Sequence, residues 1–190
     1  SFNFEPQERD VIRILLNYGQ DYIQLDIEND ETGEAETVEA PLAEFIITEL
    51  DADEIQMTTP KFQTILDEYI TLLNEEQNIQ NQHFTGHENA TVRDTAVELL
   101  SEPYELHRWE ARNIFVKTEK DRLFAAAKGA LFALKTKHLN KMIAAIQEEI
   151  KSRYNEGESI DELLEQQSKL MEVKKSLSTE QGITILKWPS

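Results

Sequence analysis

The long stretch over residues 118–154 constrains the fold more than any other part of the sequence. It contains no proline, and Gly129 is its only glycine. Most of its other residues favour helix. At a rise of 1.5 Å per residue, one helix of this length would extend roughly 50 Å.

The hydrophobicity of this stretch changes along its length. From Leu123 to Leu134 every residue except Lys128 and Gly129 is apolar, which requires burial on several sides. After Lys135 a single apolar stripe remains, formed by Leu139, Met142, Ile143, Ile146, Ile150 and Tyr154. We therefore expect the first part to lie within a helical bundle and the second part to leave it with one face to cover.

A second helix that could cover this face follows at once. Residues 155–157 (Asn-Glu-Gly) have turn chemistry. The next helix carries a set of apolar residues that we place on one face: Ile160, Leu163, Leu164, Leu170, Met171 and Leu177. Two antiparallel helices with a short turn form an αα-hairpin. This hairpin either projects from the bundle, ready for a partner, or folds back as the last two helices of the bundle.

The rest of the chain is also mostly helical. Pro6, Pro41 and Pro60 each mark the start of a helix, and residues 88–100 form another. Between residues 20 and 40, Ile23, Leu25 and Ile27 alternate with polar residues, which fits a short strand. For this segment the sequence allows either a small β-hairpin or a loop, ordered or disordered.

These patterns predict an all-α fold, a helical bundle followed by a long helix and a C-terminal αα-hairpin, with a possible β-hairpin or loop insertion near residues 20–40. We divide the chain into an acidic bundle over residues 1–134, a hairpin over residues 135–180 and a tail over residues 181–190. The chain begins at Ser1 rather than Met, so we expect it to be a piece of a longer protein.

Charge is distributed unevenly between the two parts of the chain. Residues 1–106 contain only Arg9, Arg13, Lys61 and Arg93 against 25 acidic residues, a net charge of −21, whereas residues 107–190 carry +3. The acidic part repels phosphate, so we expect no direct nucleic-acid binding. No apolar run approaches the ~20 residues that cross a bilayer, and no signal peptide is present. We therefore predict a cytoplasmic protein that makes no membrane contact.

Candidate catalytic and metal-binding residues are few. The chain has no cysteine. His83 and His87 have a spacing that could hold a metal on a helix, but Gly86 lies between them in a loop-like stretch, so an ordinary loop is favoured. No glycine-rich phosphate loop, nucleophile elbow or catalytic triad can be recognised. The sequence therefore predicts no catalytic, cofactor-binding or metal-binding residue.

Two segments resemble a known family. Residues 8–19 (ERDVIRILLNYG) and the hairpin region over residues 130–177 resemble the C-terminal domain of bacterial DNA primase (DnaG). In that family an all-α bundle is followed by a helical hairpin that binds the hexameric replicative DNA helicase (DnaB). Residues 19–40, residues 101–117 and the tail with Trp188 have no counterpart in the family pattern.

The resemblance implies a non-catalytic interaction domain that couples primer synthesis to the replication fork. The nucleotidyltransferase motifs of a primase are missing here and would lie elsewhere in the parent protein. Helicase-contacting residues should be apolar hairpin groups that do not hold the two helices together, and we choose Tyr154, Ile160, Leu164 and Met171. For each of them, packing within the hairpin is the alternative. For the whole chain, the alternatives are a helical scaffold unrelated to replication and a helical enzyme that binds a small molecule.

Overall fold

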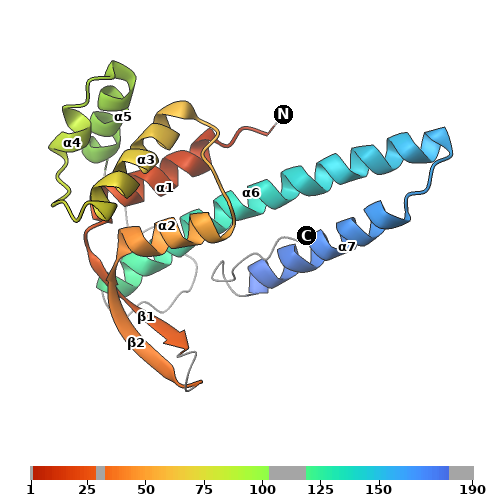
Figure 1. Cartoon of the computed structure of the whole chain (residues 1–190), viewed down its shortest axis with the longest axis horizontal. Helices are drawn as coiled ribbons and strands as arrows, with labels where there is room; N and C mark the ends of the chain where they lie inside the picture. Colours follow the sequence, from red (N-terminus) through yellow and green to blue (C-terminus); the bar gives the residue numbers. More distant parts are fainter. Residues whose placement is uncertain (1, 29–32, 103–118, 180–190) are drawn as a thin grey trace.

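The chain was analysed as a computed structural model, which describes residues 2–28, 33–102 and 119–179. Its helices are α1 (Glu5–Tyr18), α2 (Leu42–Ala52), α3 (Pro60–Asn74), α4 (Gln82–Thr85), α5 (Ala90–Ser101), α6 (Glu119–Glu156) and α7 (Asp161–Thr179). Strands β1 (Tyr22–Glu28) and β2 (Ala35–Pro41) pair antiparallel. The predicted fold class is confirmed (Figure 1). The tail over residues 181–190 and most of the stretch over residues 101–117 lie outside the described residues.

Helix α1 lies at the centre of the bundle, against α2, α3, α5 and α6. Its apolar residues surround most of the helix and are buried: Val11, Ile12, Ile14, Leu15 and Leu16. Gly19 ends the helix. A side chain at Gly19 would overlap the hydroxyl of Tyr69, so glycine is needed there for this close approach, although its φ of −58° is one that any residue adopts.

The segment between α1 and α2 is a β-hairpin, so the first of the two alternatives for residues 20–40 is correct. Ile23 pairs with Ala40 and Leu25 with Val38 on one face of the ladder. Ile23 is fully buried in the bundle core, and Leu25 packs against that core. Ile27 lies further out and is exposed. The alternation therefore buries one face where the strands leave the bundle and leaves their far end in solvent.

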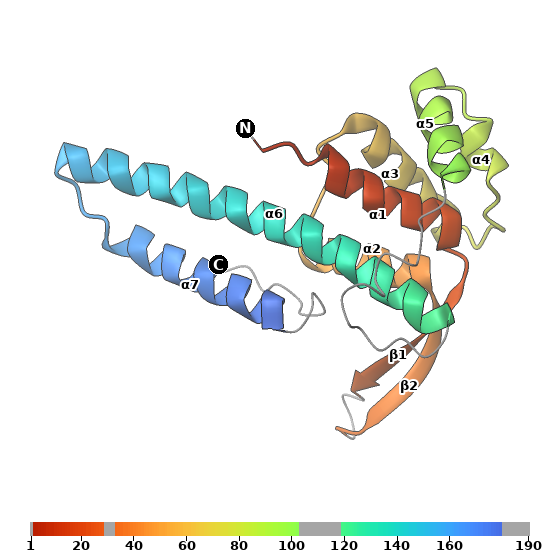
Figure 2. The same cartoon turned by 180° about the vertical axis from the view of Figure 1, so that it is seen from behind.

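Helix α6 begins inside the bundle and leaves it, as its change in hydrophobicity predicts. Leu123, Leu131 and Leu134 belong to the bundle core, whereas Leu139 and Ile143 belong to a second, separate core. Helix α7 lies antiparallel to the distal half of α6 and is separated from helices α1–α5 (Figures 1 and 2). The hairpin therefore projects from the bundle rather than folding back onto it.

Candidate protein-interaction surface

The hairpin is held together by a small core of its own. Its buried residues are Leu139 and Ile143 from α6 and Leu170 and Leu177 from α7. Phe132, Ile146 and Val173 pack against them and remain partly accessible. This core is too small to cover every apolar side chain of the two helices, so some of these side chains stay in solvent.

Three of the four residues predicted to contact a partner are exposed on the hairpin. Tyr154 is 72% exposed, Met171 52% and Leu164 45%, while Ile160 is half-buried. Placing the six apolar residues chosen over positions 160–177 on one face was wrong. Leu163, Leu170 and Leu177, each seven residues apart, point inward, and Leu164 and Met171 lie one position further round the helix and point outward. Leu164 and Met171 therefore meet the condition of not holding the two helices together.

A groove between the two helices adds to this surface. It has a volume of about 300 Å³ and is lined by Met142 and Ile146 of α6 and by Glu162, Glu165, Gln166, Lys169 and Leu170 of α7. Glu165 and Lys169 form an ion pair of 2.9 Å on its rim, and the Lys169 ammonium lowers the pKa of Glu165. Met142 is 37% exposed. Sequence reasoning noted Met142 as part of the α6 stripe but did not choose it as a contact.

The tip of the hairpin is a tight turn that presents Tyr154. Gly157 has φ +74°, a conformation that favours glycine. The Gly157 amide donates to the Tyr154 carbonyl and the Glu158 amide to the Arg153 carbonyl, which caps α6. Lys151 and Arg153 form ion pairs with acidic residues one turn earlier on α6. The tip therefore combines a rigid turn, internally paired charges and one exposed aromatic ring.

A buried ion triad lies where α6 leaves the bundle. The Lys135 ammonium is fully buried and lies 2.6 Å from both the Glu49 and the Asp53 carboxylates of the α2 region. One turn further, the Phe4 ring lies against the His138 ring at a tilt of 37°, with ring centroids 4.4 Å apart. These contacts hold the root of the hairpin against α2 and the N-terminal segment. Sequence reasoning missed the triad because its members are distant in the chain, although a lysine ending an apolar run was a signal.

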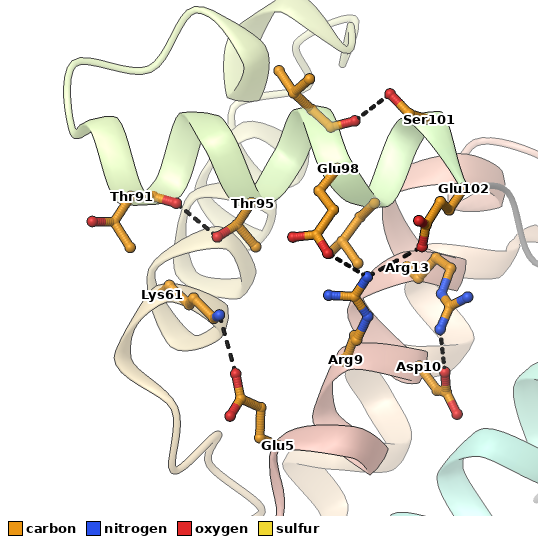
Figure 3. Close-up of polar contacts among 12 residues, drawn as sticks. Glu5, Arg9, Asp10, Arg13, Lys61, Thr91, Thr95, Glu98, Ser101 and Glu102 are labelled. Atoms are coloured by element: carbon orange, nitrogen blue, oxygen red, sulfur yellow. Dashed lines mark hydrogen bonds and ion pairs between the residues drawn. The ribbon is translucent and has the colours of Figure 1, made fainter.

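The acidic half of the chain uses its basic residues internally. Arg9 of α1 pairs with Glu98 of α5, at 2.8 Å, and with Glu102 just after that helix, at 3.3 Å, and Lys61 of α3 pairs with Glu5, at 3.1 Å (Figure 3). Arg13 pairs with Asp10 within α1. Since these cations are already paired, most of the carboxylates in this half keep an uncompensated negative charge. Such a surface disfavours phosphate.

The two histidines considered as metal ligands serve local contacts. His87 Nε2 meets the carboxylate of Glu68, and His83 Nδ1 accepts a hydrogen bond from the Gln80 amide. Among the residues that the structure describes, no group of three or more His, Cys, Asp or Glu side chains could hold a metal ion. Over the same residues, no helix has the length and apolar character needed to span a membrane.

Comparison with known proteins identifies a family. Residues 2–185 match the family described as Domain of unknown function (DUF8430), and the chain belongs to this family. The match includes both the bundle and the hairpin, so the two regions are parts of one family domain. Neither the curated proteins nor the solved structures contain a match to the chain.

Proposed function

We propose that this DUF8430 member is a non-catalytic protein-interaction domain whose α6–α7 hairpin binds the replicative DNA helicase, a DnaB-type hexamer. The observation that carries the proposal is a hairpin that projects from the bundle with exposed apolar side chains, Tyr154, Leu164 and Met171. The resemblance of residues 8–19 and 130–177 to the C-terminal domain of DNA primase supplies the identity of the partner. The parent protein would then be a DNA primase, and the domain would tether primer synthesis to the unwinding fork.

The hairpin has the features of a helix-on-helix docking element. Leu163, Leu170 and Leu177 are buried on the inner face of α7, which leaves Leu164 and Met171 on its outer face for a partner. A partner helix that covers them would bury apolar surface, with charged side chains such as Glu165 and Lys169 at the edge of the contact. A hexamer presents several copies of such a site to a tethered domain, so a modest affinity for each site would suffice.

The proposal is tested by calorimetric titration of the chain against the replicative helicase of the same organism. In the Leu164→Asp/Met171→Asp double variant, two exposed apolar contacts are replaced by charges that would be buried at the interface. We expect binding to weaken at least ~30-fold, the size of a hot-spot loss of about 2 kcal/mol. The Ile160→Asp/Leu164→Asp double variant tests whether Ile160, the half-buried residue just before α7, also contributes to binding.

Val97→Asp is the matched control, because Val97 is 46% exposed and lies on α5 in the bundle. It should bind like the unmodified chain. Unchanged affinity in a double variant that retains its helical circular dichroism would overturn the placement of the contact on α7. If the intact, folded chain does not bind the helicase at all, a helical scaffold unrelated to replication becomes the better account.

A further inference from the structure

A second groove lies on the bundle, between α2 and α3. It has a volume of about 390 Å³. Its floor is apolar and consists of Ile47, Leu50, Ile55, Leu66 and Ile70. Asp51 and the amide side chains of Gln56 and Gln63 form part of its rim. We call this site the α2–α3 groove.

The end of α2 builds one wall of the α2–α3 groove. The Ile55 amide donates to the Leu50 carbonyl at 2.9 Å and the Glu54 amide to the Asp51 carbonyl at 3.0 Å, which is a Schellman motif. This motif brings Ile55 next to Leu50 and turns both toward the groove. On the other wall, Leu66 and Ile70 are one turn apart on α3, and Ile70 is half-buried. The groove therefore presents apolar anchoring positions from two rigid elements.

The C-terminal end of α2 carries negative charges, which is the opposite of the charge that stabilises this end of a helix. The C-terminal end of a helix carries the negative end of its dipole and is stabilised by cations. The end of α2 instead holds Asp51, Asp53 and Glu54, with no basic residue in its last turn. Asp53 is matched by the buried Lys135. Asp51 and Glu54 are exposed and have no side-chain partner among the described residues.

Within residues 42–74, the segment that builds both walls of the groove, no unpaired cation is available to meet these charges. Lys61 is the only basic residue between positions 42 and 74, and it is paired with Glu5 of α1. On the same stripe of α2 as Ile47 and Asp51, Glu44 is also exposed. The α2–α3 groove thus combines an apolar floor with an uncompensated negative rim.

We propose that the α2–α3 groove binds a segment of another protein that carries two or more apolar anchors flanked by Lys or Arg. The anchors would cover Ile47 and Ile70, and the cations would meet Asp51, Glu54 and the carbonyl end of α2. An acidic segment is repelled by the same rim, which gives the site its specificity. This interaction is separate from the hairpin contact proposed above.

The probe is a synthetic 14-residue amphipathic peptide of Leu and Lys, compared with one in which Glu replaces each Lys. Binding is followed on the intact ¹⁵N-labelled chain by NMR. We expect the Leu/Lys peptide to shift amides within residues 44–56 and 63–70 and to leave those of α7 unchanged, and the Leu/Glu peptide not to bind. Asp51→Lys should weaken binding about tenfold, equivalent to about 1.4 kcal/mol.

Asp94→Lys is the matched control for charge, because Asp94 lies exposed on α5 with only a 3.8 Å contact to Arg93. Ile70→Gln should weaken binding, and Val97→Gln, at an exposed apolar position of α5, should not. Circular dichroism establishes that each variant is folded. The hairpin variant Leu164→Asp/Met171→Asp should bind the peptide normally, which separates this site from the helicase contact.

Four results would overturn the proposal. Equal binding of the Leu/Glu peptide would remove the role of charge, and shifts spread over α1 and α5 would indicate unspecific attraction to the acidic surface. Binding that requires deletion of residues 181–190 would show that the tail of the chain, with Lys187 and Trp188, occupies the groove in place of a separate partner. Absence of binding by both the intact and the shortened chain would also contradict it.

Discussion

The two halves of α6 are one continuous helix but stand in different surroundings. The half inside the bundle is buried on several sides, with Leu123, Leu131 and Leu134 in a core that α1, α2 and α3 share. Beyond the contacts of Phe4 with His138 and Lys141, the distal half packs against α7, and its core consists of a few leucines and Ile143. Burial of apolar surface is the main stabilising contribution. The hairpin is therefore expected to be the less stable region, and its exposed apolar side chains are available for another protein.

The largest effect on stability is expected at the point where the two halves of α6 meet. Replacing Lys135 with Ala would leave the buried Glu49 and Asp53 carboxylates without their cation. We expect the bundle to lose about 3–5 kcal/mol of unfolding free energy, measured by urea denaturation. Adding Glu49→Gln and Asp53→Asn to Lys135→Met should recover most of this loss. A single variant as stable as the unmodified chain would contradict the role assigned to the triad.

Equal truncations in the two regions should have different consequences. Leu170→Ala and Leu131→Ala each remove a buried leucine side chain, at a cost of about 2–5 kcal/mol. In the hairpin this loss should open α7 and distal α6 locally, whereas in the bundle it should lower the stability of the whole domain. Amide hydrogen exchange distinguishes the two outcomes. Loss of protection in α1 on Leu170→Ala would show that the two regions unfold together.

Helix ends provide a smaller contrast between the regions. Helix α6 ends with Gly157 at φ +74°, whereas α2 ends with Glu54 at φ +52° in the same type of motif. A side chain at positive φ is strained by about 1 kcal/mol. Gly157→Ala should therefore destabilise the hairpin, although no atom would clash with the new methyl group, and Glu54→Gly should stabilise the bundle by up to ~1 kcal/mol. Thermal unfolding measures both changes, and shifts in the same direction would contradict the assignment.

The smallest expected effect is a pH dependence at the root of the hairpin. Burial lowers the pKa of His138 below its ordinary value of 6.5, although the Glu8 carboxylate partly offsets this and Lys141 adds to it. The unfolded chain then binds the proton more readily, so this contribution to stability is complete above pH 6.5 and falls as the pH is lowered through that value. His138→Phe should remove this part of the pH dependence. Parallel stability curves for the two proteins between pH 5 and 7 would contradict the assignment.

Much of this architecture could be predicted from the sequence because it depends on local patterns. The alternation of Ile23, Leu25 and Ile27 indicated a strand. The change of pattern near Lys135 marked where α6 leaves the bundle. In each case the deciding residues are close together in the chain.

The remaining features depend on contacts between distant segments. The apolar residues over positions 160–177 cover more than one helix face, so the pattern did not distinguish inward Leu163 from outward Leu164. For the same reason, the apolar pattern did not show whether the hairpin projects from the bundle or folds back onto it. Lys135 meets Glu49 across 86 positions, and the α2–α3 groove requires two helices whose crossing no periodicity specifies.

Hydrogen exchange of the intact chain with and without the replicative helicase tests the central claim most directly. If the hairpin carries the interaction, the helicase should slow exchange of amides in distal α6 and in α7, including those around Tyr154, Leu164 and Met171. Exchange within α1 and α5 should stay as it is in the isolated chain. Protection confined to the bundle, or no added protection at saturating helicase, would contradict the claim.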